Sequence, residues 1–379
     1  MTSATAGLTS APEAEELRRR LAGELEDLIA ANSSLPGHWY SDQAIFDLEM
    51  AHVFGVSWLY AGSMSRLAEP GDYFTTEIAL MPVVVVRDND GAINAFINVC
   101  RHRGHIVCSG EGNRSTLQCP YHAWTYGLDG ALRGAPRSNR EPGFDKTKFP
   151  LVRLKVDTWG PFIFVNRDLD AAPLADVLGD MPQAVAAHRF DVTAYGSRVR
   201  EEWEVATNWK IALDNGGECY HCATTHPDFH RNYHTGSDEY AIELHDGWTY
   251  QGCSLRDESI VETRPDLAEG GAYNQFMLWP TFKLLIFGNW MGVHVDNPIS
   301  PSRTVKRLES FFAHDADEGG IQEFHDYVRG VMEEDVSVVE LTHRGAATGL
   351  VPPGPLFCNS GEEMLQFWQR RLQQAFSTE

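Results

Sequence analysis

Two short segments of this chain each pair a cysteine with a histidine. Cys100 and His102 are separated by one residue, and after a gap of 16 residues Cys119 and His122 follow, separated by two. Glycines and a proline flank both segments, which predicts that they lie on loops at the ends of strands. Two such loops can close on one metal cluster. Two thiolates would bind one iron of a [2Fe–2S] cluster, and two neutral imidazoles would bind the other.

A structural zinc site is the main alternative for these four residues. Zinc fingers usually pair cysteine with cysteine and histidine with histidine, whereas each segment here mixes the two. Four unrelated core or surface residues are the remaining alternative, which the paired spacing disfavours. His105 and Cys108 lie in the same loop, and we expect them to pack near the site rather than to bind metal.

A second group of candidate ligands lies about 100 residues further along the chain. Asn208 can cap a helix that begins there. Glu218 and His221 are three residues apart, which predicts that they share a helical face. Two threonines and Pro227 surround His226, and they predict that the helix ends between the two histidines. The end of a helix followed by a turn can bring both imidazoles to one metal.

Two histidines leave room for a carboxylate ligand, and a predicted helix over residues 319–343 supplies one. Asp335 falls on its apolar stripe, where an unpaired charge would cost several kcal/mol. A metal is one partner for it; an arginine or a buried network is the alternative. His221, His226 and Asp335 together would form a two-histidine, one-carboxylate triad, which leaves positions on Fe(II) open for O₂ and substrate. The predicted stripe consists of Ile321, Phe324, Val328, Val331, Val338 and Thr342, whereas Glu333, Glu334 and Glu340 are expected on other faces.

Cysteine usage and overall charge limit the classes of function. The seven cysteines are an odd number, and no export signal is recognisable, so we expect metal ligands or free thiols rather than a disulfide framework. A redox or zinc interpretation of Cys219 and Cys222 is disfavoured, because no second ligand pair follows them.

The net charge of −22 argues against nucleic acid or an anionic membrane as partner. The sequence shows no apolar span or signal peptide, and a cytoplasmic location is expected.

The pattern along the chain predicts an α+β protein. Helices are expected over residues 12–31 and 44–57, and strands over 81–87, 92–99 and 162–165. A further strand over 198–206, three strands within 280–313 and the helix over 319–343 follow. Strands and helices are segregated, unlike in a βαβ array. We assign residues 1–57 to N-terminal helices, 58–168 to an all-β cluster domain and 169–379 to a catalytic domain that includes the N-terminal helices.

Taken together, the two ligand groups resemble those of the α-subunits of Rieske non-haem iron oxygenases, the ring-hydroxylating oxygenase family. The resemblance spans nearly the whole chain and includes Trp124 after the second cysteine–histidine pair. It implies an all-β Rieske domain and a helix-grip (START-like) catalytic domain with an antiparallel sheet. It also implies a homotrimer, in which a carboxylate connects the cluster of one subunit to the iron of its neighbour. Glu218 takes that place here, between His122 and His221, where the family usually has aspartate.

The string from Glu218 to Cys222 is similar to that of the carnitine and glycine-betaine oxygenases within the family. The resemblance therefore implies mono-oxygenation of a small molecule, commonly N-demethylation of an amine or quaternary ammonium compound, with Asn215 as a further catalytic residue. Hydroxylation or dihydroxylation of an aromatic or other carbon skeleton is the alternative. An electron carrier without oxygenase activity is disfavoured by the length of chain beyond the cluster. No nucleotide-binding glycine motif is present, so NAD(P)H is expected to act only through a separate flavin and iron–sulfur reductase.

Overall fold

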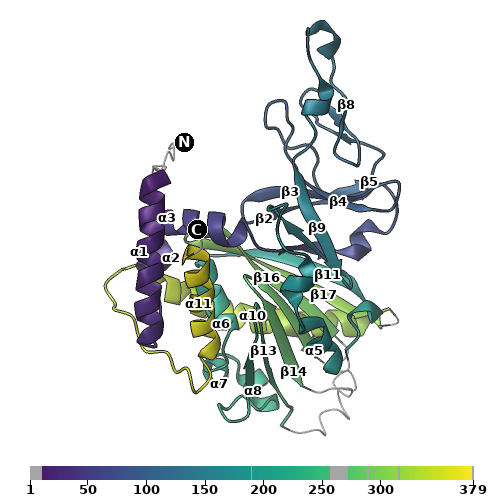
Figure 1. The fold of residues 1–379 in the computed structure, drawn as a ribbon. Helices are drawn as coiled ribbons and strands as arrows, with labels where there is room; N and C mark the ends of the chain where they lie inside the picture. The colour runs from purple at the N-terminus through teal and green to yellow at the C-terminus, as the bar shows by residue number, and fades with distance from the viewer. Residues whose placement is uncertain (1–10, 189, 257–271, 288–289, 315, 378–379) are drawn as a thin grey trace. The chain divides into compact units, whose positions relative to one another are not determined.

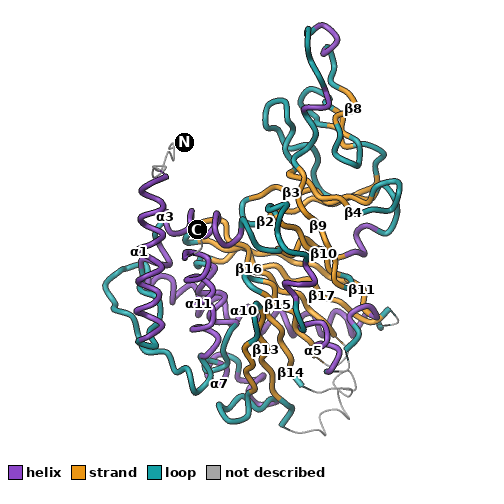
Figure 2. Tube along the Cα trace, viewed as in Figure 1, coloured by secondary structure: helices purple, strands orange, loops and turns teal. Residues whose placement is uncertain are grey.

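The computed structural model describes residues 11–188, 190–256, 272–287, 290–314 and 316–377 of the chain (Figure 1). The chain divides into two compact units. The smaller unit comprises Gly55–Gly179 and Asp191–Ser197. The larger unit comprises Met1–Phe54, Asp180–Phe190 and Arg198–Glu379. Figure 2 shows the helices in purple and the strands in orange, and the paired strands of the sheets are antiparallel. The expected α+β class is confirmed.

The smaller unit contains a seven-stranded sheet, in the order β1-β10-β9-β4-β3-β2-β5, and a three-stranded sheet of β6, β7 and β8. The strands expected over residues 81–87 and 92–99 form a hairpin: Asp88 accepts hydrogen bonds from the N–H groups of Asp90 and Ala92, and Gly91 adopts a positive φ of 86°. The strands are β1 (Leu59–Ser63), β2 (Asp72–Ile78), β3 (Met81–Arg87), β4 (Ile93–Ile97), β5 (Glu111–Asn113), β6 (Leu117–Gln118), β7 (Thr125–Tyr126), β8 (Leu132–Gly134), β9 (Arg153–Trp159) and β10 (Phe162–Asn166). A short helix, α4 (Leu174–Leu178), follows them.

The larger unit is built on one seven-stranded antiparallel sheet, in the order β11-β17-β16-β15-β14-β13-β12. The three strands expected within residues 280–313 are confirmed as β15, β16 and β17. The strands are β11 (Tyr195–Val205), β12 (Ala241–Leu244), β13 (Trp248–Cys253), β14 (Tyr273–Leu278), β15 (Phe282–Phe287), β16 (Trp290–Ser300) and β17 (Arg303–Ala313).

A long helix, α10 (Glu318–Ala346), packs on one face of this sheet, the arrangement expected of a helix-grip domain. The ring of Phe324 lies 6.1 Å from that of Phe287 and 5.1 Å from that of Trp290. The predicted stripe is correct in its first half only. Beyond Val328 the buried positions are Met332, Val339 and His343, whereas Val331 and Val338 are half-buried and Thr342 is exposed. The buried face follows the 3.6-residue period of a helix, and it therefore drifts away from the residues chosen from apolar type alone.

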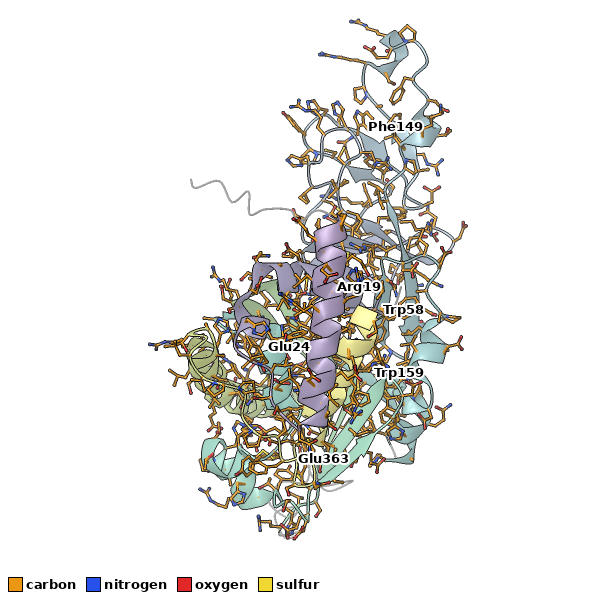
Figure 3. The ribbon with its side chains drawn as sticks, turned by 60° about the vertical axis from the view of Figure 1, so that its left-hand side comes forward. Arg19, Glu24, Trp58, Phe149, Trp159 and Glu363 are labelled. Atoms are coloured by element: carbon orange, nitrogen blue, oxygen red, sulfur yellow. A yellow bond between two sulfur atoms is a disulfide. The ribbon has the colours of Figure 1, made fainter. Side chains whose placement is uncertain are left out.

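Two further helices pack against each other at the ends of the chain. They are α1 (Ala11–Ala30) and α11 (Glu363–Ser377), and they lie side by side in Figures 1 and 3. Gln366 near the start of α11 donates to the carbonyl of Ile29 near the end of α1, so the two helices run antiparallel. The predicted helix over residues 44–57 is formed by α3 (Gln43–Glu49) and one π-helical turn, Met50–Phe54. The remaining helices are α2 (His38–Ser41), α5 (Met181–Ala187), α6 (Trp209–Gly216), α7 (Cys222–Thr225) and α8 (Pro227–Asn232).

None of the helices in the described part of the chain combines the length and apolar character needed to cross a bilayer. The cytoplasmic location expected from the sequence stays a prediction.

Candidate metal centres

The two cysteine–histidine segments of the smaller unit form a pair of similar loops. The carbonyl of Cys100 accepts from the N–H of Gly104, and the carbonyl of Cys119 accepts from the N–H of Ala123. Gly104 and Ala123 both have a positive φ, of 74° and 57° respectively. Each loop therefore reverses direction four residues after its cysteine.

The four candidate ligands separate by type. Both thiols are buried, with 3% of Cys100 and 1% of Cys119 exposed, and they lie within hydrogen-bonding distance of each other. The rings of His102 and His122 lie 4.6 Å apart, the first exposed and the second half-buried. Two adjacent sulfurs and two adjacent imidazoles fit a cluster in which one iron takes sulfur ligands and the other takes nitrogen ligands.

Three neighbouring residues support the cluster loops, and of these only Tyr126 was missed in the sequence. The hydroxyl of Tyr126 accepts from the N–H of Arg101 at 3.0 Å and lies 3.3 Å from Sγ of Cys100, so it can donate to a thiolate there. Asn98 hydrogen-bonds both the N–H and the carbonyl of Cys108 and so holds the first loop closed. Trp124 stacks on His102 with the rings 4.9 Å apart. Burial raises the pKa of the Cys108 thiol to about 11, which agrees with its expected packing role.

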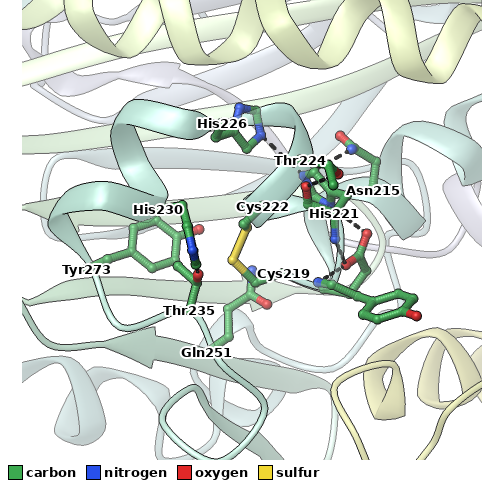
Figure 4. The surroundings of a disulfide bond; sticks show 12 residues. Asn215, Cys219, His221, Cys222, Thr224, His226, His230, Thr235, Gln251 and Tyr273 are labelled. Carbon is green, nitrogen blue, oxygen red and sulfur yellow. Dashed lines mark hydrogen bonds and ion pairs between the residues drawn. A yellow bond between two sulfur atoms is a disulfide. The ribbon is translucent and has the colours of Figure 1, made fainter.

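The second ligand group lies in the larger unit, on a broken helical segment (Figure 4). Asn208 accepts a hydrogen bond from the N–H of Lys210 and caps α6, as predicted. The prediction that Glu218 and His221 share a helical face is wrong. Helix α6 ends at Gly216, and both residues lie in the turn before α7. The carboxylate of Glu218 accepts hydrogen bonds from the N–H groups of Tyr220 and His221. These two bonds stabilise the turn in place of helical backbone hydrogen bonds.

The structure brings His221, His226 and Asp335 together. Nε2 of His221 lies 3.2 Å from Nε2 of His226, and Oδ1 of Asp335 lies 3.4 Å and 3.0 Å from these two atoms. Three ligands at right angles around a metal, each about 2.1 Å from it, lie about 3 Å from one another. Among the described residues, the triad is the one group of at least three acidic, histidine or cysteine side chains whose ligand atoms all lie within 4.8 Å of one another, as a single metal ion requires.

A carboxylate outside the triad orients each imidazole. Nδ1 of His221 lies 2.5 Å from Oε1 of Glu218, and Nδ1 of His226 lies 2.8 Å from Oε2 of Glu334. Each Nδ1 therefore carries the proton, and each Nε2 presents a lone pair to the common point. Glu334 was expected on another face of α10; its side chain is 43% exposed but reaches His226. The rule that a ligand histidine has a second carboxylate partner could have identified it.

The electrostatics of the triad favour a cation. Burial lowers the pKa of His221, but the hydrogen bonds to Asp335 and Glu218 outweigh burial and raise it to about 10. Burial raises the pKa of Asp335, but the two histidines outweigh burial and hold it well below its usual range. Asn215 completes the group: its Nδ2 lies 3.2 Å from Oδ1 of Asp335 and 3.4 Å from Nε2 of His221.

A disulfide joins Cys219 and Cys222 beside the triad (Figure 4). The expectation of metal ligands or free thiols is therefore wrong for these two cysteines. Their Cα atoms lie 5.0 Å apart, within the range that a disulfide requires. Five other cysteines are free: Cys100, Cys108, Cys119, Cys253 and Cys358.

A cavity of about 100 Å³ opens onto the triad. Its lining comes from the turn around Glu218, from strands β13 to β17 and from α10. Two glutamines of the sheet, Gln251 and Gln275, donate to the carbonyl of Gly216 at 2.8 Å and 2.7 Å and tie the end of α6 to the sheet. The cavity thus lies directly beside the three candidate iron ligands.

Comparisons with known proteins agree with this architecture. The family model for the Rieske [2Fe-2S] domain matches residues 57–155, and that for the ring hydroxylating alpha subunit (catalytic domain) matches residues 190–378. The carnitine monooxygenase oxygenase subunit of Acinetobacter pittii is 31% identical over 317 residues, which cover 82% of this chain and 85% of that protein. The chloroplastic choline monooxygenase of Spinacia oleracea is 31% identical over 83% of this chain and 72% of its own length.

Solved structures show the same likeness. A quaternary ammonium Rieske monooxygenase in complex with γ-butyrobetaine superposes with a TM-score of 0.81 at 28% identity, over 93% of this chain and 99% of that one. The fold, the cluster domain and the catalytic domain predicted from the sequence are confirmed. This chain belongs to the Rieske non-haem iron oxygenases, as an α-subunit that uses a [2Fe–2S] cluster, a mononuclear iron and O₂ to oxygenate a small molecule.

Proposed function

We propose that the substrate is a quaternary ammonium compound, and that the enzyme oxidises a carbon bonded to its nitrogen. The observation that carries this proposal is an aromatic wall in the cavity beside the triad. The ring of Tyr273 lies 5.4 Å from Phe229, 6.4 Å from Tyr240 and 5.0 Å from Phe287. Burial raises the pKa values of Tyr240 and Tyr273, so both phenols stay neutral. Each aromatic face contributes about 0.5–2 kcal/mol to binding a cation.

The relatives support the same substrate class. Their names assign carnitine to one and choline to another, and the solved neighbour holds γ-butyrobetaine. All three compounds carry a trimethylammonium group.

His221, His226 and Asp335 would hold the iron, and Cys100, Cys119, His102 and His122 would hold the cluster. When bound, the iron activates O₂ with electrons supplied through the cluster. The overall step consumes O₂, two electrons and two protons, inserts one oxygen atom into a C–H bond and releases water. The resulting N–C–OH group then breaks its C–N bond, which leaves an aldehyde and an amine. Asn215 donates to Asp335 and restrains that carboxylate, and the aromatic wall keeps the cationic nitrogen beside the triad.

Glu218 is the proposed electron bridge between subunits of a homotrimer. Its carboxylate holds Nδ1 of His221, and the adjoining Tyr220 is 67% exposed and contacts the ring of Phe357, itself 50% exposed. On the smaller unit, the half-exposed ring of Tyr121 lies 3.8 Å from that of His122. Exposed aromatic groups beside both redox sites support docking between subunits. A separate flavin and iron–sulfur reductase is the proposed electron source.

A single-turnover experiment tests the substrate class without the reductase. Protein with both metal sites filled is reduced chemically, freed of reductant and mixed with O₂ and either trimethylammonium compounds or aromatic acids. We expect aldehyde and amine in equal amounts from the trimethylammonium compounds. Hydroxylated aromatic products, with no aldehyde from any amine, would overturn the proposal.

A further inference from the structure

A cluster of charged side chains lies on the sheet side of the same cavity. Lys283 on β15, His294 on β16 and Lys306 on β17 all line the cavity. The strand register places them together, because Lys283 pairs with His294 and Lys306 pairs with Asp296. Lys283 also lies against the end of α6, since a Cβ built on Gly216 would stand 2.5 Å from its Nζ. The cluster therefore adjoins Gly216. The residue before it, Asn215, contacts Asp335 of the triad.

Two lysines of this cluster share one carboxylate. Nζ of Lys283 lies 2.6 Å from Oδ2 of Asp296, and Nζ of Lys306 lies 3.2 Å from Oδ1 of the same carboxylate. One carboxylate thus serves two ammonium groups, and all three side chains are at least 93% buried. Both lysines line the cavity, whereas Asp296 does not. The cavity therefore has two lysine side chains on its sheet side, and the carboxylate that they share lies behind them.

His294 adds a polar atom without a partner. Its Nε2 is buried and has no hydrogen-bond partner among the described residues. Burial, together with the two ammonium groups nearby, lowers the pKa of His294 to about 3, so the ring is neutral and can donate one N–H. A buried polar atom of this kind costs about 1–3 kcal/mol unless a ligand or water satisfies it.

We propose that Lys306, Lys283 and His294 form a subsite for a carboxylate at the end of the substrate opposite its ammonium group. The substrate would then be a zwitterion, and this inference rests on the proposed function. A bound carboxylate can accept hydrogen bonds from a lysine ammonium and from the unpartnered imidazole of His294. A substrate that ends in a neutral group offers these donors only a neutral acceptor, and such a hydrogen bond is weaker than a charge-assisted one. The subsite thus separates betaine-like acids from choline-like alcohols.

The test compares two ligands that differ only at the far end, 4-trimethylammoniobutanoate and its primary amide. Dissociation constants are measured by calorimetry on the anaerobic holoenzyme, so that binding is read without turnover. We expect the acid to bind about 10- to 100-fold more tightly than the amide, as charge-assisted hydrogen bonds imply. Lys306→Gln should reduce that ratio at least about 10-fold, and Lys306→Arg, which keeps the charge, should preserve most of it.

Arg307→Gln is the matched control. Arg307 is the next residue on β17, points to the opposite face and pairs with Glu202 at 2.8 Å, so its loss should leave the ratio unchanged. Equal binding of acid and amide by the wild-type protein would overturn the inference, even if Lys306→Gln fails to fold. The same two ligands are then used in the single-turnover experiment described above. Oxidation of both, with equal affinity, would overturn the subsite and leave the proposed function standing. Oxidation of neither, with tight binding of the acid alone, would reject the proposed function and keep the anion subsite.

Discussion

Nε2 of His221 faces Nε2 of His226 at 3.2 Å, although Nδ1 of each ring is already hydrogen-bonded to a carboxylate. Two imidazole lone pairs directed at one point repel each other unless a cation lies between them. The nearby Oδ1 of Asp335 adds a negative charge to the same point. A cation at this point, such as Fe(II), therefore stabilises the arrangement.

Asp335→Ala should remove the mononuclear iron and leave the cluster intact. The wild-type chain is expected to hold three iron atoms, two in the cluster and one at the triad, and the variant should hold two. Turnover should be lost, whereas the visible absorbance of the cluster should be unchanged. Iron analysis and absorbance spectra on the same sample check this. Full turnover by the variant would show that Asp335 is not a ligand.

Glu334→Gln should weaken iron binding without abolishing it. Oε2 of Glu334 holds Nδ1 of His226 at 2.8 Å, and loss of such an outer partner typically costs about 10–100-fold in metal affinity or activity. Competition with a chelator measures the affinity. Glu333→Gln is the control, because that neighbouring carboxylate pairs with Arg329 at 2.9 Å and not with a ligand. Equal affinities for the two variants would contradict the role of Glu334.

Glu218→Gln should slow electron transfer from the cluster to the iron while both metal sites stay filled. The amide oxygen of glutamine can still accept from Nδ1 of His221, but the negative charge of the bridge is lost. We expect oxidation of the reduced cluster by substrate and O₂ to slow by about 10–100-fold. Rapid-mixing spectroscopy follows the cluster, and sedimentation measures the oligomer. A fully active monomer would remove the basis for a bridge between subunits.

Asp214 should make stability depend on pH. Burial, only partly offset by Lys210 and by a hydrogen bond from Tyr40, raises the pKa of Asp214 to about 7. The unfolded carboxyl loses its proton near pH 4, so this group makes folding progressively less favourable as the pH rises from about 4 to about 7. Asp214→Asn should therefore be more stable than the wild type by up to about 4 kcal/mol at pH 8 and by little at pH 4.

Chemical denaturation of the wild-type and Asp214→Asn proteins at several pH values measures this difference. Acid unfolding from other groups affects both proteins alike and cancels in the comparison. A difference that stays constant between pH 4 and pH 8 would contradict the raised pKa.

The sequence by itself determined the ligand groups and the main elements. Cys100, His102, Cys119 and His122 are close in sequence, and short loops leave few ways to arrange them. The strands within residues 280–313 and the helix over residues 319–343 were predicted from local periodicity, which depends on neighbouring residues alone. Asp335 was found in the same way, because it interrupts an apolar pattern with a charge.

Only the tertiary structure decided which distant residues meet at the site. Glu334 reaches His226 through the rotation of α10, which the apolar pattern did not predict beyond Val328. Lys283 and Lys306 share Asp296 because of the register of three strands, and a shift of one residue would turn these side chains to the other face. Strand register and the rotation of α10 are set by packing over the whole sheet. They therefore cannot be predicted from any short stretch of sequence.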